Sequence, residues 1–157
     1  MTNYQAKTYQ DIYQDNLHPY TDEEYMTQTV RAMYRSYSNN YLCAIKNTNS
    51  IYLAASKSFV KTVGMTQENI IGKTELDFSS QVKNYYKEFY AQDRLVETQR
   101  QKLKFLDIHQ YSNGIAAYIT RKLPIINPAT NNVLGTYLVF SALKPNITNK
   151  AIKDIHK

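Results

Sequence analysis

Residues 56–74 contain two short helical signals back to back, and this segment constrains the fold more than any other part of the chain. Ser56 is a favourable N-cap for a first helix, and Gly64 can end that helix in the left-handed conformation. Thr66 can cap a second helix, which Gly72 ends. A strand-like run precedes the segment. The pattern predicts a fold in which short helices are inserted between strands.

The triplet Gly72-Lys73-Thr74 has the composition of the end of a phosphate-binding loop. Such a loop also needs a glycine five positions before Gly72, where its backbone amides would hold phosphate. Gln67 occupies that position. The spacing therefore argues against nucleotide-triphosphate chemistry.

Period-two alternation and turn residues predict five strands. Two of them pair across a polar turn before the helical segment, and three follow a long helix predicted over 81–99. The expected strands cover 41–45, 51–54, 103–111, 115–123 and 133–143. Asn113-Gly114 is a tight-hairpin signal, and Pro124 marks a strand end or edge. We therefore predict an α+β fold, a five-stranded antiparallel sheet with helices on one face plus an N-terminal helix.

The two ends of the chain differ from this central domain, which we place at 39–143. Residues 1–20 form a polar, tyrosine-rich arm, and residues 144–157 form a basic connector. Between the arm and the domain, a capping box at Thr21 and Glu24 begins a helix predicted over 21–38.

One side of this N-terminal helix carries apolar residues with gaps of four, three and four, as in a coiled-coil seam. The stripe consists of Met26, Val30, Met33 and Tyr37. It either packs onto its own domain or forms a dimer interface with a second copy, and the spacing leaves both alternatives open.

Composition limits the cellular compartment and the binding partners that we expect for this protein. The single cysteine, Cys43, excludes an internal disulfide and suits a reducing cytoplasm. No apolar run approaches the ~20 residues needed to cross a bilayer, and the polar N-terminus lacks the apolar core of a signal peptide. The net charge is +6, but the lysines and arginines are spread along the chain. We expect a cytoplasmic protein without a membrane partner, and a solvated basic surface rather than a nucleic-acid interface.

The residues typical of catalytic and metal sites are scattered. The three histidines, His18, His109 and His156, lie in separate segments, and none has a ligand partner at metal-binding spacing. No Ser-His-Asp or Cys-His arrangement can be recognised. We therefore expect no enzymatic activity, no catalytic residue and no metal.

The order of these pieces resembles the PAS family of sensory domains. The matching segments are 41–46, 55–59, 64–74, 93–98, 113–114, 122–125 and 133–135. The sequence departs from the family at three places. Ser56 replaces the usual asparagine, Gln99 replaces a glycine, and Ala142-Leu143-Lys144 replaces the terminal Asp-Ile-Thr that couples such domains to an output module.

The resemblance implies a sensory domain of a bacterial regulator. Such a domain would bind a small molecule or a partner and relay the signal through its terminal helices to an output module. We expect that module to be a helix-turn-helix regulator or a kinase in a segment that this sequence lacks, and DNA to be contacted only through it. The resemblance also implies a homodimer. The alternative is a ligand-free interaction and dimerisation module of the same fold.

The family's known chromophores can be compared with this sequence. Flavin photosensors carry a reactive cysteine just after the second short helix, and residues 75–80 contain none. Haem-binding members usually take their iron ligand from the long helix, and residues 81–99 contain no histidine. Both cofactors are disfavoured, which leaves a small organic ligand or no ligand.

A ligand pocket is expected between the long helix and the inner face of the sheet. Tyrosine suits its wall because the ring is apolar and the hydroxyl bonds in a fixed direction. Arg121 adds a bidentate donor that could hold a carboxylate. The candidate ligand-binding residues are Tyr86, Phe89, Tyr90, Phe105, Tyr118, Arg121 and Tyr137.

Overall fold

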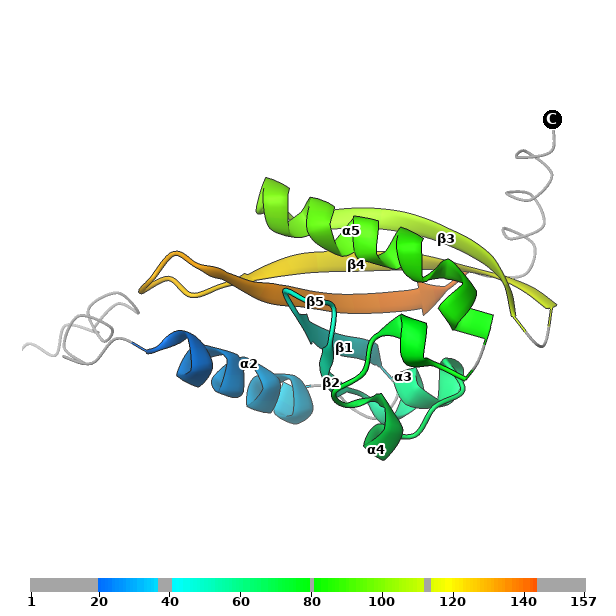
Figure 1. Ribbon diagram of the computed structural model, residues 1–157, viewed down its shortest axis with the longest axis horizontal. Coiled ribbons are helices and arrows are strands. Elements are labelled where there is room, and N and C mark those ends of the chain that lie inside the picture. Colours follow the sequence, from blue (N-terminus) through cyan, green and yellow to red (C-terminus); the bar gives the residue numbers. More distant parts are fainter. Residues whose placement is uncertain (1–19, 37–40, 80, 112–113, 144–157) are drawn as a thin grey trace, which may run out of the picture.

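The computed structural model describes residues 20–36, 41–79, 81–111 and 114–143. Figure 1 shows the elements, which are, in chain order, α2 (Asp22–Ser36), β1 (Leu42–Asn47), β2 (Tyr52–Ala55), α3 (Lys57–Thr62), α4 (Gln67–Ile70), the 3-10 helices η1 (Glu75–Asp77) and η2 (Gln81–Tyr85), α5 (Tyr86–Gln99), β3 (Leu103–Tyr111), β4 (Gly114–Ile126) and β5 (Val133–Ala142). Apart from Tyr20, the predicted arm (1–20) and connector (144–157) lie outside the described residues. None of the described helices is long and apolar enough to span a membrane.

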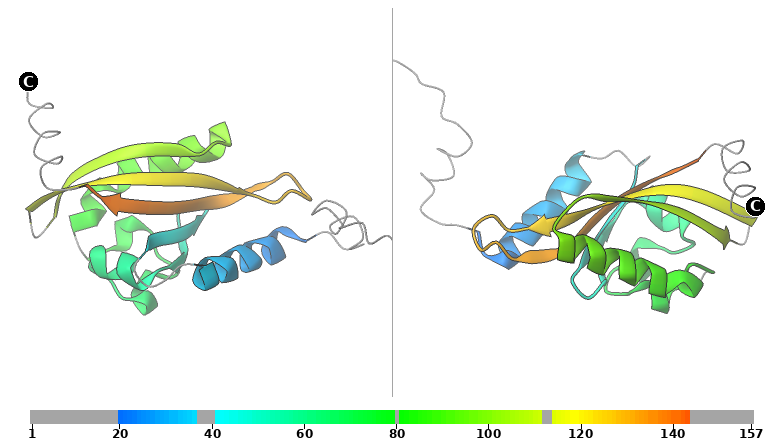
Figure 2. Two further views of the ribbon diagram at one scale, coloured as in Figure 1. Left: turned by 180° about the vertical axis from the view of Figure 1, so that it is seen from behind. Right: turned by 90° about the horizontal axis from the view of Figure 1, so that it is seen from above.

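The five strands form one antiparallel sheet with the order β2-β1-β5-β4-β3. The last strand of the chain, β5, lies between β1 and β4, so the two ends of the domain meet at the centre of the sheet (Figure 2). The predicted α+β fold and its antiparallel sheet are confirmed. Pairing with β2 shifts register between Ile45 and Lys46, which makes a local irregularity in β1.

The two short helices form where the caps predict them. The Ser56 hydroxyl accepts from the Phe59 amide at 3.2 Å, and the Thr66 hydroxyl accepts from the Asn69 amide at 3.3 Å. Gly64 and Gly72 both have positive φ, as their role at helix ends requires. These helices carry the chain from β2 around to α5.

Several predicted boundaries were wrong. The long helix begins with 3-10 turns over Gln81–Tyr85, and the α-helix begins only at Tyr86. The predicted hairpin between β3 and β4 is present, but Gly114 is the first residue of β4, paired with Tyr111, and not a central residue of the turn. Pro124 lies inside β4, beyond the last residue that pairs with β3, where only β5 is its partner. That side of the strand is an edge, so the edge alternative predicted for Pro124 is correct and only the predicted strand end at residue 123 is wrong.

Strand alternation divides the interior into two clusters, one on each face of the sheet. The first face carries Ala44 and Leu138, which pack with α3 residues such as Phe59. The second face carries Cys43 and Ile45. Helices α3 and α5 contact the first face.

Helix α2 packs on the second face of the sheet, opposite α5 (Figure 2). Met33 is 3% exposed and belongs to the cluster, and Met26 and Val30 pack against it while remaining half-buried. Most of the apolar stripe therefore contacts its own domain. Tyr37, the fourth residue of the stripe, lies outside the described residues.

The β4–β5 loop holds the first turn of α2. The Asp22 carboxylate accepts hydrogen bonds from Asn127 (2.9 Å), Thr130 (2.6 Å) and Asn132 (2.9 Å). Asn127 is fully buried and also donates to the Tyr20 carbonyl at 3.0 Å. The side-chain bonds, led by that from Asn132, hold the pKa of Asp22 below its ordinary value of 3.8. Asp22 thus fixes the start of α2 to the sheet.

Replacing Asp22 by alanine is expected to lower the melting temperature at neutral pH. Because its folded pKa is lowered, the carboxylate stabilises the fold fully above its ordinary pKa of 3.8, and the contribution is lost as pH falls through the folded value. The difference between wild type and Asp22→Ala should therefore shrink in acid, measured by circular dichroism melts across pH. The adjacent, exposed Glu23→Ala is the control. A difference that does not depend on pH would contradict a role for the charge.

Candidate functional site

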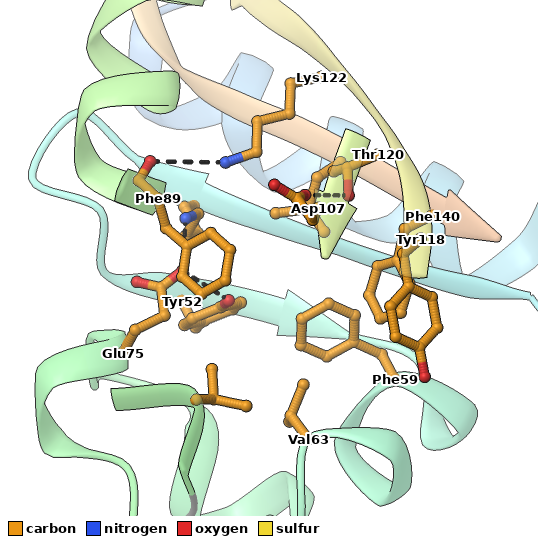
Figure 3. Close-up of a pocket in the computed structure, with 13 residues that line it drawn as sticks. Tyr52, Phe59, Val63, Glu75, Phe89, Asp107, Tyr118, Thr120, Lys122 and Phe140 are labelled. Atoms are coloured by element: carbon orange, nitrogen blue, oxygen red, sulfur yellow. Dashed lines mark hydrogen bonds and ion pairs between the residues drawn. The ribbon is translucent and has the colours of Figure 1, made fainter. Parts of the chain in front are cut away.

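A pocket lies between the first face of the sheet and the elements that cover it, η1, η2, α3 and α5 (Figure 3). Its volume, counted as the space open to the centre of a water molecule, is about 60 Å³. All five strands contribute to its wall. The lining residues are Lys46, Tyr52, Phe59, Val63, Glu75, Val82, Phe89, Asp107, Tyr118, Thr120, Lys122, Leu138 and Phe140. The pocket is thus mostly apolar, with a few polar groups.

Aromatic rings form much of the apolar wall. Phe59 packs edge-on against Phe140, with ring centroids 5.1 Å apart, and Tyr118 meets Phe140 in the same way at 5.1 Å. Tyr52 lies 5.6 Å from Phe59. Figure 3 shows Phe89 approaching Tyr52 from the side of α5. Rings held in this way favour a small, flat, apolar body between them.

Four buried charges form a network at the polar end of the pocket. Lys46 Nζ lies 2.7 Å from Glu75 Oε1 and 2.5 Å from Asp93 Oδ2. Lys122 Nζ lies 2.7 Å from Asp93 Oδ1, and its longer contact with the Phe89 carbonyl is 3.5 Å. The side chains of all four are at most 3% exposed. Each charge is thus paired, as burial in a low dielectric requires.

Hydrogen bonds from neutral groups complete this network. The Tyr52 hydroxyl donates to Glu75 Oε1 at 2.9 Å, and the Ser50 hydroxyl donates to Asp93 Oδ2 at 2.8 Å. Burial and the adjacent Glu75 carboxylate raise the pKa of Tyr52 well above its ordinary value. The tyrosine therefore stays protonated and remains a donor.

Electrostatics keep the centre of the network ionised. Burial alone would lower the pKa of Lys46, but Glu75 and Asp93 outweigh it and raise that pKa. Burial alone would raise the pKa of Asp93, but Lys46 and Lys122 hold it below its ordinary value. Lys122 differs, since burial and the nearby Lys46 charge lower its pKa despite its pairing with Asp93. Lys122 is therefore the more easily deprotonated of the two lysines.

A second polar group lies where β3 meets the pocket. Asp107 accepts from the Thr120 hydroxyl at 2.6 Å and from the Gln92 amide at 2.7 Å. His109, two residues along the same strand, is buried and stacks on Tyr85 with ring centroids 3.9 Å apart. In the described part of the chain, no three His, Cys, Asp or Glu residues are grouped as metal ligands would be.

The structure brings only two of the seven candidate ligand-binding residues to the pocket, Phe89 and Tyr118. Phe105 does not line it, but its ring lies 5.9 Å from Lys122 Nζ. Tyr86 and Tyr90 also lie outside the lining, and they pack edge-on against each other along α5.

Arg121 and Tyr137 lie on the opposite face of the sheet. Arg121 alternates with the pocket residues Thr120 and Lys122, so its side chain leaves from the other side of β4. Tyr137 packs against the α2 cluster. Arg121 is therefore not placed to hold a carboxylate in this pocket.

Sequence reasoning missed the buried charges. The predicted first strand ends at residue 45 and so excludes Lys46, whereas β1 continues to Asn47. One signal was available, because Asp93 falls on the apolar side of the long helix and a buried carboxylate needs a cationic partner. Side chains alternate between the two faces of β1, so Lys46 lies on the same face as the buried Ala44.

Comparison with known proteins identifies the fold family. The PAS fold matches residues 38–143, most of the chain. The chain belongs to the PAS-fold family. No curated protein sequence matches it significantly.

Solved VqmA structures are similar to this chain. A phage VqmA in complex with DPO is 29% identical with a TM-score of 0.70, and the match covers 87% of this chain and 62% of that one. The VqmA–ligand–DNA complex from Vibrio cholerae is 25% identical with a TM-score of 0.63, covering 71% and 50%. The chain thus spans between half and about three-fifths of these VqmA chains.

A third structure supports the fold alone. The PAS domain of BvgS from Bordetella pertussis is 12% identical with a TM-score of 0.62, and the match covers 83% of this chain and 96% of that domain. The matched structures thus include PAS domains as well as VqmA, a LuxR-type receptor.

Proposed function

We propose that this PAS domain is the ligand-binding sensory part of a transcription regulator, and that DPO is the ligand to test first. The observation that carries the proposal is the pocket, which combines an aromatic wall with buried polar groups at one end. The 29% identity with phage VqmA in its DPO complex, over 87% of this chain, supports the choice of ligand.

The regulator's output belongs to the same proposal. VqmA is described in complex with ligand and DNA, and as a LuxR-type receptor that forms a dimer. By analogy, we propose that a DNA-binding module receives the signal in the cytoplasm and that the protein acts as a homodimer. Met26 and Val30 remain half-buried on α2 and stay our candidates for the dimer interface, together with Tyr37, whereas Met33 is buried in its own domain and is not accessible to a partner. We propose no enzymatic role.

Adding DPO is expected to raise the melting temperature of the protein. A ligand that binds only the native state stabilises it by about 2.7 kcal/mol at a concentration of 100 Kd. Val63→Phe should lower DPO affinity at least tenfold, because Val63 lines the pocket and the added ring occupies its space. Thermal shift and isothermal titration calorimetry measure both effects.

Val133→Phe is the matched control, since it makes the same increase in size at a half-buried position that does not line the pocket. It should bind DPO as the wild type does. If DPO leaves the wild type unchanged, DPO is rejected as the ligand. If no compound in a metabolite screen shifts the melt, the ligand-free interaction module is the correct alternative.

A further inference from the structure

One oxygen of a buried carboxylate in the pocket wall has no hydrogen-bond partner among the described residues. Glu75 is 2% exposed and belongs to η1. Its Oε1 accepts from both Lys46 and Tyr52, at 2.7 and 2.9 Å. Its Oε2 is enclosed and has no hydrogen-bond partner among the described residues. Such an acceptor is costly to bury unless something donates to it.

Both oxygens of the other acidic residue in the pocket wall already have a hydrogen-bond donor. Asp107 Oδ1 accepts from Gln92, and its Oδ2 accepts from Thr120. Among the carboxylate oxygens of the residues that line the pocket, Glu75 Oε2 is therefore the one without a hydrogen-bond donor in the described part of the chain. A ligand with an N–H or O–H group would satisfy it.

The cations of the pocket wall are already paired. Lys46 contacts both Glu75 and Asp93, and Lys122 contacts Asp93. An anionic ligand would have to compete with these buried carboxylates for the same ammonium groups, and it would be repelled by Glu75. The pocket thus disfavours an anion and offers an acceptor.

We propose that Glu75 is the specificity-determining residue of the pocket, with its Oε2 accepting a hydrogen bond from an N–H or O–H group of an uncharged ligand. The inference rests on the proposed function, because it assumes that the pocket takes a small molecule. It adds that the molecule must carry a hydrogen-bond donor and that Glu75 selects for this donor.

The test compares three probes of similar size: 2-pyridone, which has an N–H donor, 1-methyl-2-pyridone, which has none, and the anion benzoate. Wild-type protein should bind 2-pyridone at least tenfold more tightly than either of the others. Protein-observed NMR titration, which also measures weak binding, gives the three dissociation constants and shows whether the resonances of the pocket residues shift.

Glu75→Gln should abolish this preference or reverse it. Lys46 and Tyr52 both donate toward Oε1, so the amide oxygen keeps that position and the amide nitrogen takes the position of Oε2. An acceptor is thereby exchanged for a donor. Glu68→Gln, on the exposed side of α4, is the matched control and should keep the wild-type preference.

Each outcome decides a separate point. Equal binding of both pyridones by the wild type, or tighter binding of benzoate, would overturn the inference and leave the proposed function standing. A Glu75→Gln protein that keeps the tenfold preference would overturn the role of Glu75. If neither the probes nor DPO bind, the proposed function fails and the inference fails with it. The wild-type comparison decides the donor requirement even if Glu75→Gln does not fold.

Discussion

Replacing Lys46 by methionine is expected to lower the free energy of unfolding by about 3–5 kcal/mol, the usual effect of removing one partner from a buried ion pair. Lys46 is fully buried, and its ammonium group is shared between Glu75 and Asp93. Methionine fills a similar volume but leaves two buried carboxylates without that cation. Urea denaturation followed by circular dichroism measures the loss.

The control for this prediction is Lys61→Met, the same substitution at an exposed position of α3, which should change stability by less than about 0.5 kcal/mol. A loss at Lys46 no larger than that at Lys61 would show that the buried pairs contribute nothing. A double variant with Asp93→Leu should lose less than the sum of the two single losses, because the residues share one network.

Gly135→Ala is expected to destabilise the fold by more than about 3 kcal/mol, at the upper end of what overpacking costs. A Cβ at this position would lie 2.0 Å from the Lys46 carbonyl oxygen and 3.0 Å from the Asn47 Cα, both in the backbone of β1. Neither atom can rotate away. The clash would separate β1 from β5 where Gly135 pairs with Asn47, and the loss is again measured by urea denaturation.

Gly72→Ala provides the comparison, because a Cβ there would meet nothing within 4 Å and only the positive φ of +83° opposes it. Its cost should be about 1 kcal/mol. Equal effects at the two glycines would mean that close backbone approach is not what Gly135 provides.

The order of elements was predictable because each element has a local cause. Ser56 and Thr66 cap their helices through their own hydroxyls, and Gly64 and Gly72 end them in the conformation that glycine allows. These signals need no information about the rest of the chain. Strand order was harder, since nothing in β5 itself indicates that it inserts between β1 and β4.

The candidate site was less predictable because it depends on which face of a strand each side chain takes. Tyr118 and Arg121 are three residues apart, so they cannot lie on the same face of a regular strand, and only Tyr118 lines the pocket. Aromatic residues were favoured as pocket residues, whereas lysines were assigned to solvent. Lys46 and Lys122 can be buried in the pocket wall because they pair with Glu75 and Asp93. These carboxylates belong to elements that are distant in sequence from the two lysines.

The sheet between the two clusters is only one layer thick. Ile45 contacts the α2 cluster and Lys46 contacts the pocket, so adjacent residues of β1 belong to opposite sides. The peptide group that joins them is common to both compartments, and it lies where pairing with β2 changes register. We therefore expect that a displacement of Lys46 is passed to the face on which α2 packs through a single peptide group of β1.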